Sequence, residues 1–242
     1  MKKVIINSAK FAVRAALHPS YGSEQIKLFR DRRLINKKRY DDYIEWFDKH
    51  KATEEQLDRQ RKISKDFKYR PLISILLPTY NTNPTYLRSC IDSVLSQSYD
   101  NWELCISDDN STSEQTKDVI KEYVEKYDNV IVTFRKENGH ISKSSNTALS
   151  MAKGDYISLL DHDDILPPNA LFEVVNAINK NPEVDLIYTD EDKIDHEGNH
   201  IEPFFKPDWS PDFMNSCNMI THFATMKANI IRGVNGFTVG TH

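Results

Sequence analysis

Three carboxylates fall within four residues of this sequence, at Asp161, Asp163 and Asp164. They follow the apolar run 156–160 and precede two prolines at 167–168, a pattern that predicts a buried strand ending in an acidic turn. Like charges so close together repel one another unless a cation or water shares the charge. Carboxylate oxygens suit Mg²⁺ or Mn²⁺, which proteins hold through one or two carboxylates together with substrate phosphates. The stretch alone leaves two interpretations open, a divalent-metal site or a solvated acidic turn.

The surrounding sequence alternates between strand and helix patterns from residue 72 onward. The expected strands are 72–77, 102–107, 129–134, 156–160 and 184–188, and the expected helices are 84–97, 113–127, 139–151 and 168–179. Such alternation predicts an α/β fold, with a mostly parallel sheet flanked by helices and joined by right-handed crossovers. We therefore expect one α/β domain over residues 71–242, preceded by a helical N-terminal extension over residues 1–70.

Polar residues concentrate where the expected strands end. Asp108 and Asp109 follow the second strand, and an acidic run at 190–192 follows the fifth. The first strand ends in the sequence Pro-Thr-Tyr-Asn at 78–81. Ligands of open α/β sheets bind beyond the carboxyl ends of the strands, so these groups and 161–164 are expected at one edge of the sheet. An acidic edge of this kind favours a metal ion or cationic substrate groups as its partner.

Charge is unevenly distributed along the 242 residues. Residues 1–40 carry eleven Lys or Arg against two acids, a charge of +9; the whole chain carries −4, so the remainder carries −13. An acidic body argues against nucleic-acid binding, whereas the basic arm fits an anionic membrane surface or an acidic partner. The three cysteines lack paired spacing, which indicates a reducing compartment without a disulfide framework or zinc site. No apolar run is long enough to span a bilayer, and no signal peptide is recognisable, so we expect a cytoplasmic protein.

The N-terminal region carries helix signals but no evident chemistry. Residues 2–17 could form an amphipathic helix, packed either on its own protein, on a twin subunit, or on the inner face of the membrane. Aromatic residues at helical spacing over 40–47 favour packing. Residues 53–56 read Thr-Glu-Glu-Gln and predict a capping box that begins another helix.

Four motifs in order resemble those of family 2 glycosyltransferases, which have the GT-A fold. They are Leu77–Asn81, Ser107–Ser111, Asn138–Ser142 and Leu160–Asp164. The resemblance extends from about Leu72 to Phe237, and the segments 188–193 and 205–212 resemble bacterial members that build surface polysaccharides. It implies a Rossmann-like GT-A domain, a nucleotide-sugar donor, a divalent cation (Mg or Mn), and a saccharide or lipid-linked acceptor.

The resemblance also implies roles for individual residues. The expected nucleotide-sugar-binding residues are Pro78, Tyr80, Asp108, Asp109, Gly139, Lys143, Asp161 and His162. Tyr80 would stack on the base, and Asp109 would accept hydrogen bonds from the ribose or base. Asp108 either contacts the nucleotide or caps the following turn, and Lys143 is either a nucleotide contact or a solvated lysine. Gly139 would allow a tight turn, next to a helix N-terminus that favours phosphate.

Metal binding and catalysis follow from the same resemblance. Asp163 is the first choice as metal ligand, with Asp161 facing the ribose or the waters of the metal, and the cation would neutralise the leaving diphosphate. In this family a carboxylate base activates the acceptor hydroxyl, and the anomeric configuration inverts. That base usually lies soon after a Gly-Phe element, here at 236–237, and no acid follows before His242.

The missing acid leaves three alternatives, namely a fragment of a longer enzyme, a base from elsewhere in the chain, or weak activity. The fallback candidates for the base are Asp190, Glu191 and Asp192. The residues expected on the acceptor side are Asp192, Trp209 and His222.

Two other functions compete with a metal-dependent inverting glycosyltransferase. A non-catalytic nucleotide-sugar-binding or scaffolding domain would account for the absence of a matching base. A phosphatase with a nucleophilic acid pair fits poorly, because that pair usually follows the first strand, whereas here it follows the fourth.

Overall fold

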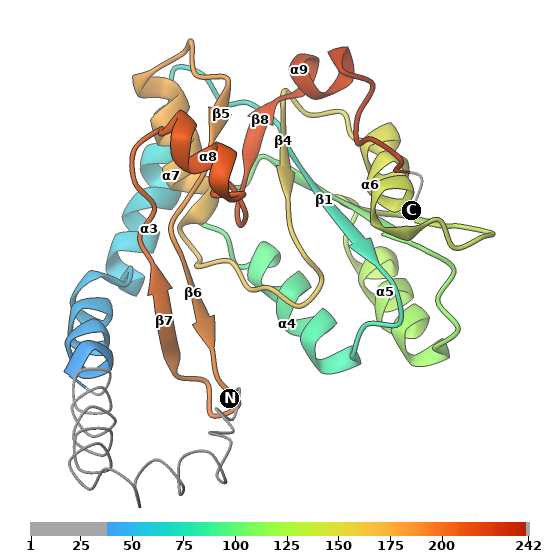
Figure 1. Cartoon of the computed structure of the whole chain (residues 1–242), viewed down its shortest axis with the longest axis horizontal. Coiled ribbons are helices and arrows are strands. Elements are labelled where there is room, and N and C mark those ends of the chain that lie inside the picture. The colour runs from blue at the N-terminus through green and yellow to red at the C-terminus, as the bar shows by residue number, and fades with distance from the viewer. Residues whose placement is uncertain (1–37, 241–242) are drawn as a thin grey trace, which may run out of the picture. The chain divides into compact units, whose positions relative to one another are not determined.

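The computed structural model describes residues 38–240 (Figure 1). These residues form two compact units, which we treat separately: one comprises 38–51 and 192–203, and the other comprises 52–191 and 204–240. The expected amphipathic segment 2–17 and most of the basic arm lie outside the described residues. Within the described part of the chain, no helix has the length and apolar character needed to cross a membrane.

A six-stranded sheet forms the centre of the larger unit, with the strand order β3-β2-β1-β4-β8-β5. The strands are β1 (Ile73–Thr79), β2 (Trp102–Asp108), β3 (Val130–Phe134), β4 (Tyr156–Leu159), β5 (Leu186–Ile187) and β8 (Thr225–Lys227). The pairs β1–β2, β2–β3 and β1–β4 are parallel, as expected (Figure 1). Strand β8 pairs antiparallel with both β4 and β5. The mostly parallel sheet is therefore confirmed, with one inserted antiparallel strand that the sequence patterns did not predict.

The strand register brings the polar strand ends to one edge of this sheet. Strand β1 lies between β2 and β4, and Thr79 at its carboxyl end pairs with Asp108. On the other side, Leu76 pairs with Leu159, one of the last residues before the acidic turn. The backbone of Asp109 continues this arrangement by donating to the carbonyl of Thr79 at 2.8 Å.

Helices cover both faces of the sheet. They are α4 (Pro84–Leu95), α5 (Glu114–Lys126), α6 (His140–Met151), α7 (Ala170–Lys180) and α9 (Ala228–Gly233). Side chains of α4, α5 and α7 share one buried cluster with Ile75, Leu77 and Ile106 of the sheet, whereas α6 and α9 share another with Leu76 and Ile157. The period-2 alternation of each strand thus supplies apolar side chains to both faces, and two hydrophobic layers fix the strand ends.

Several local features match their sequence signals. Helix α3 (Glu54–Ile63) begins with the expected capping box, in which the side chain of Thr53 accepts from the backbone of Gln56 and the reverse bond is also present. Strand β8 begins at Thr225, and His222 lies in the turn that precedes it, with a φ of 49°.

The smaller unit combines a helix over 38–50 with the hairpin of β6 (Glu191–Ile194) and β7 (His200–Phe204), whose outermost residues belong to the larger unit. The Tyr43 hydroxyl donates to Asp192 Oδ2 at 2.5 Å, and His200 Nδ1 lies 2.7 Å from the same oxygen. The ring of Phe47 stacks on His200, with 3.9 Å between their centroids. The expected aromatic packing at 40–47 is confirmed within this unit.

Candidate functional site

The acidic turn after β4 converges with the turn that contains His222. Asp161, Asp164 and His222 each offer a ligand atom, and these atoms all lie within 4.8 Å of one another. The imidazole Nδ1 of His222 is 2.9 Å from Asp164 Oδ2 and 3.8 Å from Asp161 Oδ2. Two carboxylates and one imidazole at such distances form a set of ligand atoms that can bind a single divalent ion.

The electrostatics of this cluster favour a bound cation. Burial raises the pKa of Asp164 above its usual value, and the neighbouring carboxylates of Asp161, Asp163 and Glu191 add to the rise. The nearby His222 opposes it and lowers the same pKa. An acid that is costly to ionise in the free protein becomes favourable once a positive charge shares its site.

Helix α4 supports the acidic turn from behind. The thiol of Cys90 donates to the carbonyl of Asp161 at 3.5 Å, and the backbone N–H of Leu166 donates to the hydroxyl of Ser93 at 3.1 Å. Gln97 donates to the carbonyl of Pro167 at 2.9 Å. The first two contacts come from successive turns of α4 and the third from Gln97 just beyond its end, so together they fix the acidic turn against this helix.

Asp163, the first sequence-based choice as metal ligand, lies outside the three-residue cluster. Its side chain is 61% exposed, and its Oδ1 is 3.7 Å from Nδ1 of His162. The geometry therefore brings Asp161 together with Asp164 and His222, whereas the family motif points to Asp161 and Asp163.

Asp109 lies at the end of β2 in a buried network. Arg135 Nε donates to Asp109 Oδ1 at 2.7 Å, and the backbone N–H of Gly139 donates to both carboxylate oxygens at 3.0 and 2.9 Å. The side chain of Arg135 also donates to Thr147 of α6 and to the carbonyl of Lys143. Arg135 therefore links the end of β2 to helix α6, and it lies in the loop that joins β3 to α6.

Gly139 is required by the close packing of this loop. A Cβ at this position would come within 2.6 Å of an Arg135 nitrogen and 2.7 Å of the Lys143 side chain. Lys143 thus extends along the loop beside Arg135, at the first turn of α6.

Asp108, by contrast, forms hydrogen bonds within the turn that follows β2. It is fully buried and accepts hydrogen bonds from the backbone and hydroxyl of Ser111 at 2.9 and 2.6 Å. This arrangement corresponds to the turn-capping alternative.

The neighbouring loop after β1 is tied to the same region. Asn81 accepts from the backbone of Thr112 and Ser113 at 2.8 and 3.0 Å. Pro78 lies within β1, paired with Ser107, and Tyr80 follows the strand with 46% of its surface exposed. A half-exposed ring on an anchored loop is available for stacking.

The remaining candidate acids are engaged in side-chain contacts. Asp190 Oδ1 accepts from the backbone N–H of Lys206 at 2.7 Å, and Glu191 Oε2 forms an ion pair with Lys206 Nζ at 2.9 Å. Asp192 belongs to the smaller unit, where it accepts from Tyr43. Trp209 is 57% exposed, just before the short helix α8 (Pro211–Ser216).

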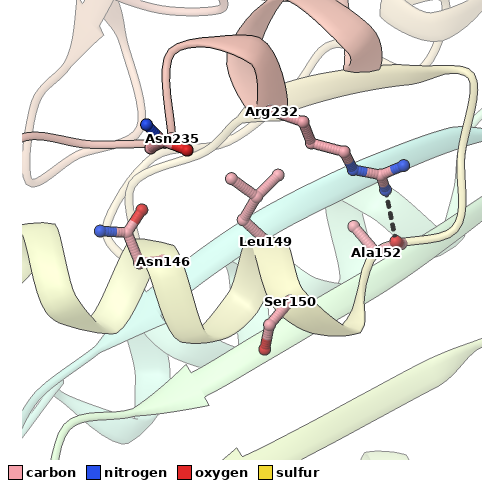
Figure 2. A pocket seen from close by; sticks show the side chains of 7 residues that line it. Asn146, Leu149, Ser150, Ala152, Arg232 and Asn235 are labelled. Atoms are coloured by element: carbon pink, nitrogen blue, oxygen red, sulfur yellow. Dashed lines mark hydrogen bonds between the residues drawn. The ribbon is translucent and has the colours of Figure 1, made fainter.

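A hollow of about 590 Å³ lies away from the strand ends, between α6 and the segment after α9 (Figure 2). Figure 2 shows Asn146, Leu149 and Asn235 around it, with Arg232 donating to the carbonyl of Ala152. Nearby, the side chain of Asn146 exchanges two hydrogen bonds of 2.8 Å with the backbone of Phe237. This pair of bonds fixes the Gly-Phe element on helix α6.

The sequence profile described as "Glycosyl transferase family 2" matches residues 74–234, which include β1, the acidic turn and the His222 turn. The chain belongs to glycosyl transferase family 2. Its GT-A fold places the cluster of Asp161, Asp164 and His222 and the hydrogen-bond network of Asp109 at the strand ends.

Two curated relatives match most of this chain. An uncharacterised protein of Sinorhizobium fredii, y4gI, is 46% identical over 170 residues, covering 70% of this chain and 19% of the relative. The O-antigen biosynthesis protein RfbC of Myxococcus xanthus is 36% identical over 171 residues, covering 71% of this chain and 13% of the relative. The chain therefore spans only a fifth or less of the length of these two relatives.

A solved structure shares the fold of this chain. The mannosyltransferase PcManGT of Pyrobaculum calidifontis, in complex with GDP-Man and Mn²⁺, superimposes with a TM-score of 0.55 at 18% identity. The match covers 76% of this chain and 56% of that protein. At this identity the similarity establishes the fold.

Three residues of the described site were not selected from the sequence. Arg135 follows the third strand, so the strand-end rule that drew attention to the acids would also have selected it. Asp164 was part of the acidic cluster, but the family motif favoured Asp163. Lys206 lies in the segment 205–212 that carries part of the family resemblance, but its role could not be read there, because its contacts with Glu191 and with the His222 turn join segments distant in sequence.

Proposed function

We propose that this chain is the donor-binding domain of a divalent-metal-dependent, inverting glycosyltransferase. It would move a sugar from a nucleotide-sugar donor to a saccharide or lipid-linked acceptor during cell-surface polysaccharide synthesis. The observation that carries the proposal is the meeting of Asp161, Asp164 and His222 at the strand edge that also holds Asp109. The similarity to an O-antigen biosynthesis protein supports the choice of pathway class.

The clustered carboxylates and imidazole fit a divalent cation. We assign Asp161, Asp164 and His222 as its ligands on geometry, with Asp163 as the alternative ligand from the family motif. The imidazole favours Mn²⁺ over Mg²⁺, because Mg²⁺ is held almost entirely by oxygen. When bound, the cation supplies Lewis-acid stabilisation of the departing nucleoside diphosphate.

The nucleoside end of the donor fits the first two strand ends. Tyr80 stacks on the base, while Asp109 and Arg135 define the polar wall of the base and ribose site. Lys143 lies at the first turn of α6, where its ammonium group and the backbone N–H groups of the helix N-terminus favour the binding of phosphate. Asp108 acts indirectly by holding the turn beside Tyr80.

The acceptor hydroxyl attacks the anomeric carbon from the face opposite the leaving group, which inverts the configuration. Its proton passes to a carboxylate. Within this chain the fallback bases are Asp190, Glu191 and Asp192, although each already contacts Lys206 or Tyr43. Trp209 is proposed to stack on the acceptor sugar.

The test uses the full-length protein and a panel of UDP-sugars and GDP-sugars, each with and without Mn²⁺. Calorimetry should show that donor binding requires Mn²⁺ and is lost in Asp161→Asn and Asp164→Asn. Retained binding in Asp163→Asn assigns the third carboxylate a secondary role, whereas lost binding restores the family assignment. Asp185→Asn is the control, because that acid pairs with Lys227 outside the cluster. Donor binding that is unaffected by Mn²⁺ contradicts the proposal.

Transfer distinguishes the enzyme from the alternative, a nucleotide-sugar-binding or scaffolding domain. An active enzyme releases nucleoside diphosphate and forms a product whose anomeric proton shows inversion by NMR. Mn²⁺-dependent donor binding with no release under any acceptor would favour the binding domain instead, and a product of retained configuration would contradict inversion.

The basic N-terminal arm is proposed as a peripheral contact with the inner face of the membrane. It carries a charge of +9 over residues 1–40. Deletion of this arm should abolish sedimentation with vesicles containing anionic lipid, and unchanged sedimentation contradicts the contact.

A further inference from the structure

The side chain of Lys206 is almost completely buried beside the acidic strand edge, with 1% of its surface exposed. Its ammonium group contacts three oxygens: Glu191 Oε2 at 2.9 Å, the carbonyl of His222 at 2.8 Å, and the carbonyl of Thr221. An ammonium group has three N–H donors and no acceptor. Two of them serve the carbonyls of Thr221 and His222, and the Glu191 carboxylate balances the charge as an ion pair. A buried lysine is costly unless it is paired in this way.

These contacts hold the turn that presents His222. The carbonyl oxygens of two successive residues of that turn accept from one cation, and the His222 carbonyl also accepts from the Thr189 hydroxyl at 3.2 Å. The Phe223 N–H donates back to Thr189 at 3.0 Å. Lys206 therefore fixes the backbone from which the imidazole reaches Asp164, 2.9 Å away.

Lys206 itself is anchored independently of its ammonium group. Its backbone N–H donates to Asp190 at 2.7 Å, and Tyr188 donates to the carbonyl of the next residue, Pro207, at 2.9 Å. The segment around Lys206 is thus attached at several points to the chain that follows β5. A substitution at this position can remove the ammonium contacts while its backbone remains attached.

We propose that Lys206 is a positioning residue that sets His222 against the Asp161–Asp164 pair, and so completes the metal site. The inference rests on the proposed function for its metal, but the position of His222 can be measured without one. Lys206 acts through His222 and touches no ligand atom of the cluster.

A positioning role and a purely electrostatic role of Lys206 predict opposite changes in metal affinity. If Lys206 acted only as a nearby positive charge, removing it would strengthen binding of a divalent cation, because like charges repel. If it positions a ligand, removing it weakens that binding, and losses of outer contacts around metal ligands typically cost about 10- to 100-fold in affinity.

The experiment measures binding of Mn²⁺ alone to the full-length protein, using the EPR signal of free Mn²⁺. Lys206→Met should weaken binding about tenfold, in the direction of His222→Ala. The double variant Lys206→Met/Glu191→Gln should behave similarly and guards against misfolding, since it leaves no unpaired buried carboxylate. Lys227→Met is the matched control, because it removes an ion pair of the same length, 2.9 Å, between Asp185 and the last residue of β8.

Crystal structures of wild type and Lys206→Met supply the second measurement. The distance between His222 Nδ1 and Asp164 Oδ2 should lengthen well beyond 2.9 Å in the variant. Unchanged or tighter Mn²⁺ binding, or an unmoved imidazole, overturns the role of Lys206. Failure of the wild type itself to bind Mn²⁺ contradicts the metal in the proposed function, and the two structures then decide the role of Lys206 alone.

Discussion

Arg135 donates its Nε–H to Asp109 across 2.7 Å, in an ion pair whose carboxylate is only 3% exposed. The two residues belong to different segments, since Asp109 follows β2 and Arg135 follows β3. The same guanidinium bonds Thr147 and the carbonyl of Lys143 on α6. One side chain thus joins the nucleoside end of the proposed donor site to the helix that flanks it.

Substitution of Arg135 by Met should destabilise the protein and impair donor binding together. It leaves the Asp109 carboxylate buried with only the Gly139 N–H as a partner, and loss of one member of a buried pair costs about 3 kcal/mol or more. Lys at this position should restore charge but not the several hydrogen bonds of the planar guanidinium. Urea unfolding and calorimetry with nucleotide sugars measure the two effects.

The control for this substitution is Arg88→Met. Arg88 pairs with Glu122 at 2.6 Å, but both side chains are largely exposed, and exposed pairs contribute little to stability. Equal destabilisation by the two substitutions would show that the Arg135–Asp109 pair has no special role.

Asp164 should make stability depend on pH in a way that Mn²⁺ reverses. Burial and the neighbouring acids raise the pKa of Asp164 in the folded protein. The protonated side chain therefore favours folding, and this contribution to stability is complete below the unfolded-state pKa of about 3.9. It is lost as the pH rises through the folded-state pKa. Without metal, Asp164→Asn should therefore be more stable than wild type at pH 7, and the difference should shrink toward pH 4. With Mn²⁺, only wild type should gain stability. A variant that is less stable at pH 7 without metal contradicts this account.

The fold was predictable because it depends on local patterns. Apolar runs such as 156–160 and the turn residues between them identified each parallel strand, and the capping box at Thr53 identified the start of α3. Strand β8 was not predicted, because three residues from Thr225 to Lys227 carry too little periodicity. Its place between β4 and β5 depends on pairing with segments far away in sequence.

The candidate site was predictable only in part. Strand-end position identified Asp109 and the acidic turn, but which carboxylates meet depends on side-chain direction. The turn directs Asp164 rather than Asp163 toward His222. The sequence also gave no reason to link Lys206 with the His222 turn, since that contact requires the folded backbone.

Cysteine reactivity should report on the packing of α4 against the acidic turn. Burial raises the pKa of the Cys90 thiol, the nearby carboxylates raise it further, and Cys105 is also buried, whereas Cys217 is exposed. Since the thiolate is the reactive form, iodoacetamide should modify Cys217 rapidly and the other two only on unfolding. Mass spectrometry of the labelled peptides measures this order. Rapid native labelling of Cys90 would contradict the close packing of α4 against the turn.

Gly236 should tolerate alanine much less well than Gly198, although both have positive φ, 77° and 85°. An added Cβ at Gly198 meets nothing within 4 Å, so Gly198→Ala isolates the backbone cost of about 1 kcal/mol. At Gly236 the Cβ would come within 2.3 Å of Asn146 Oδ1 and disrupt the two bonds to Phe237, so we expect a loss of about 3 kcal/mol. Urea unfolding measures both, and combining Gly236→Ala with Asn146→Ala should give less than the sum of the single effects. Additive effects would show that Asn146 does not hold the Gly-Phe element.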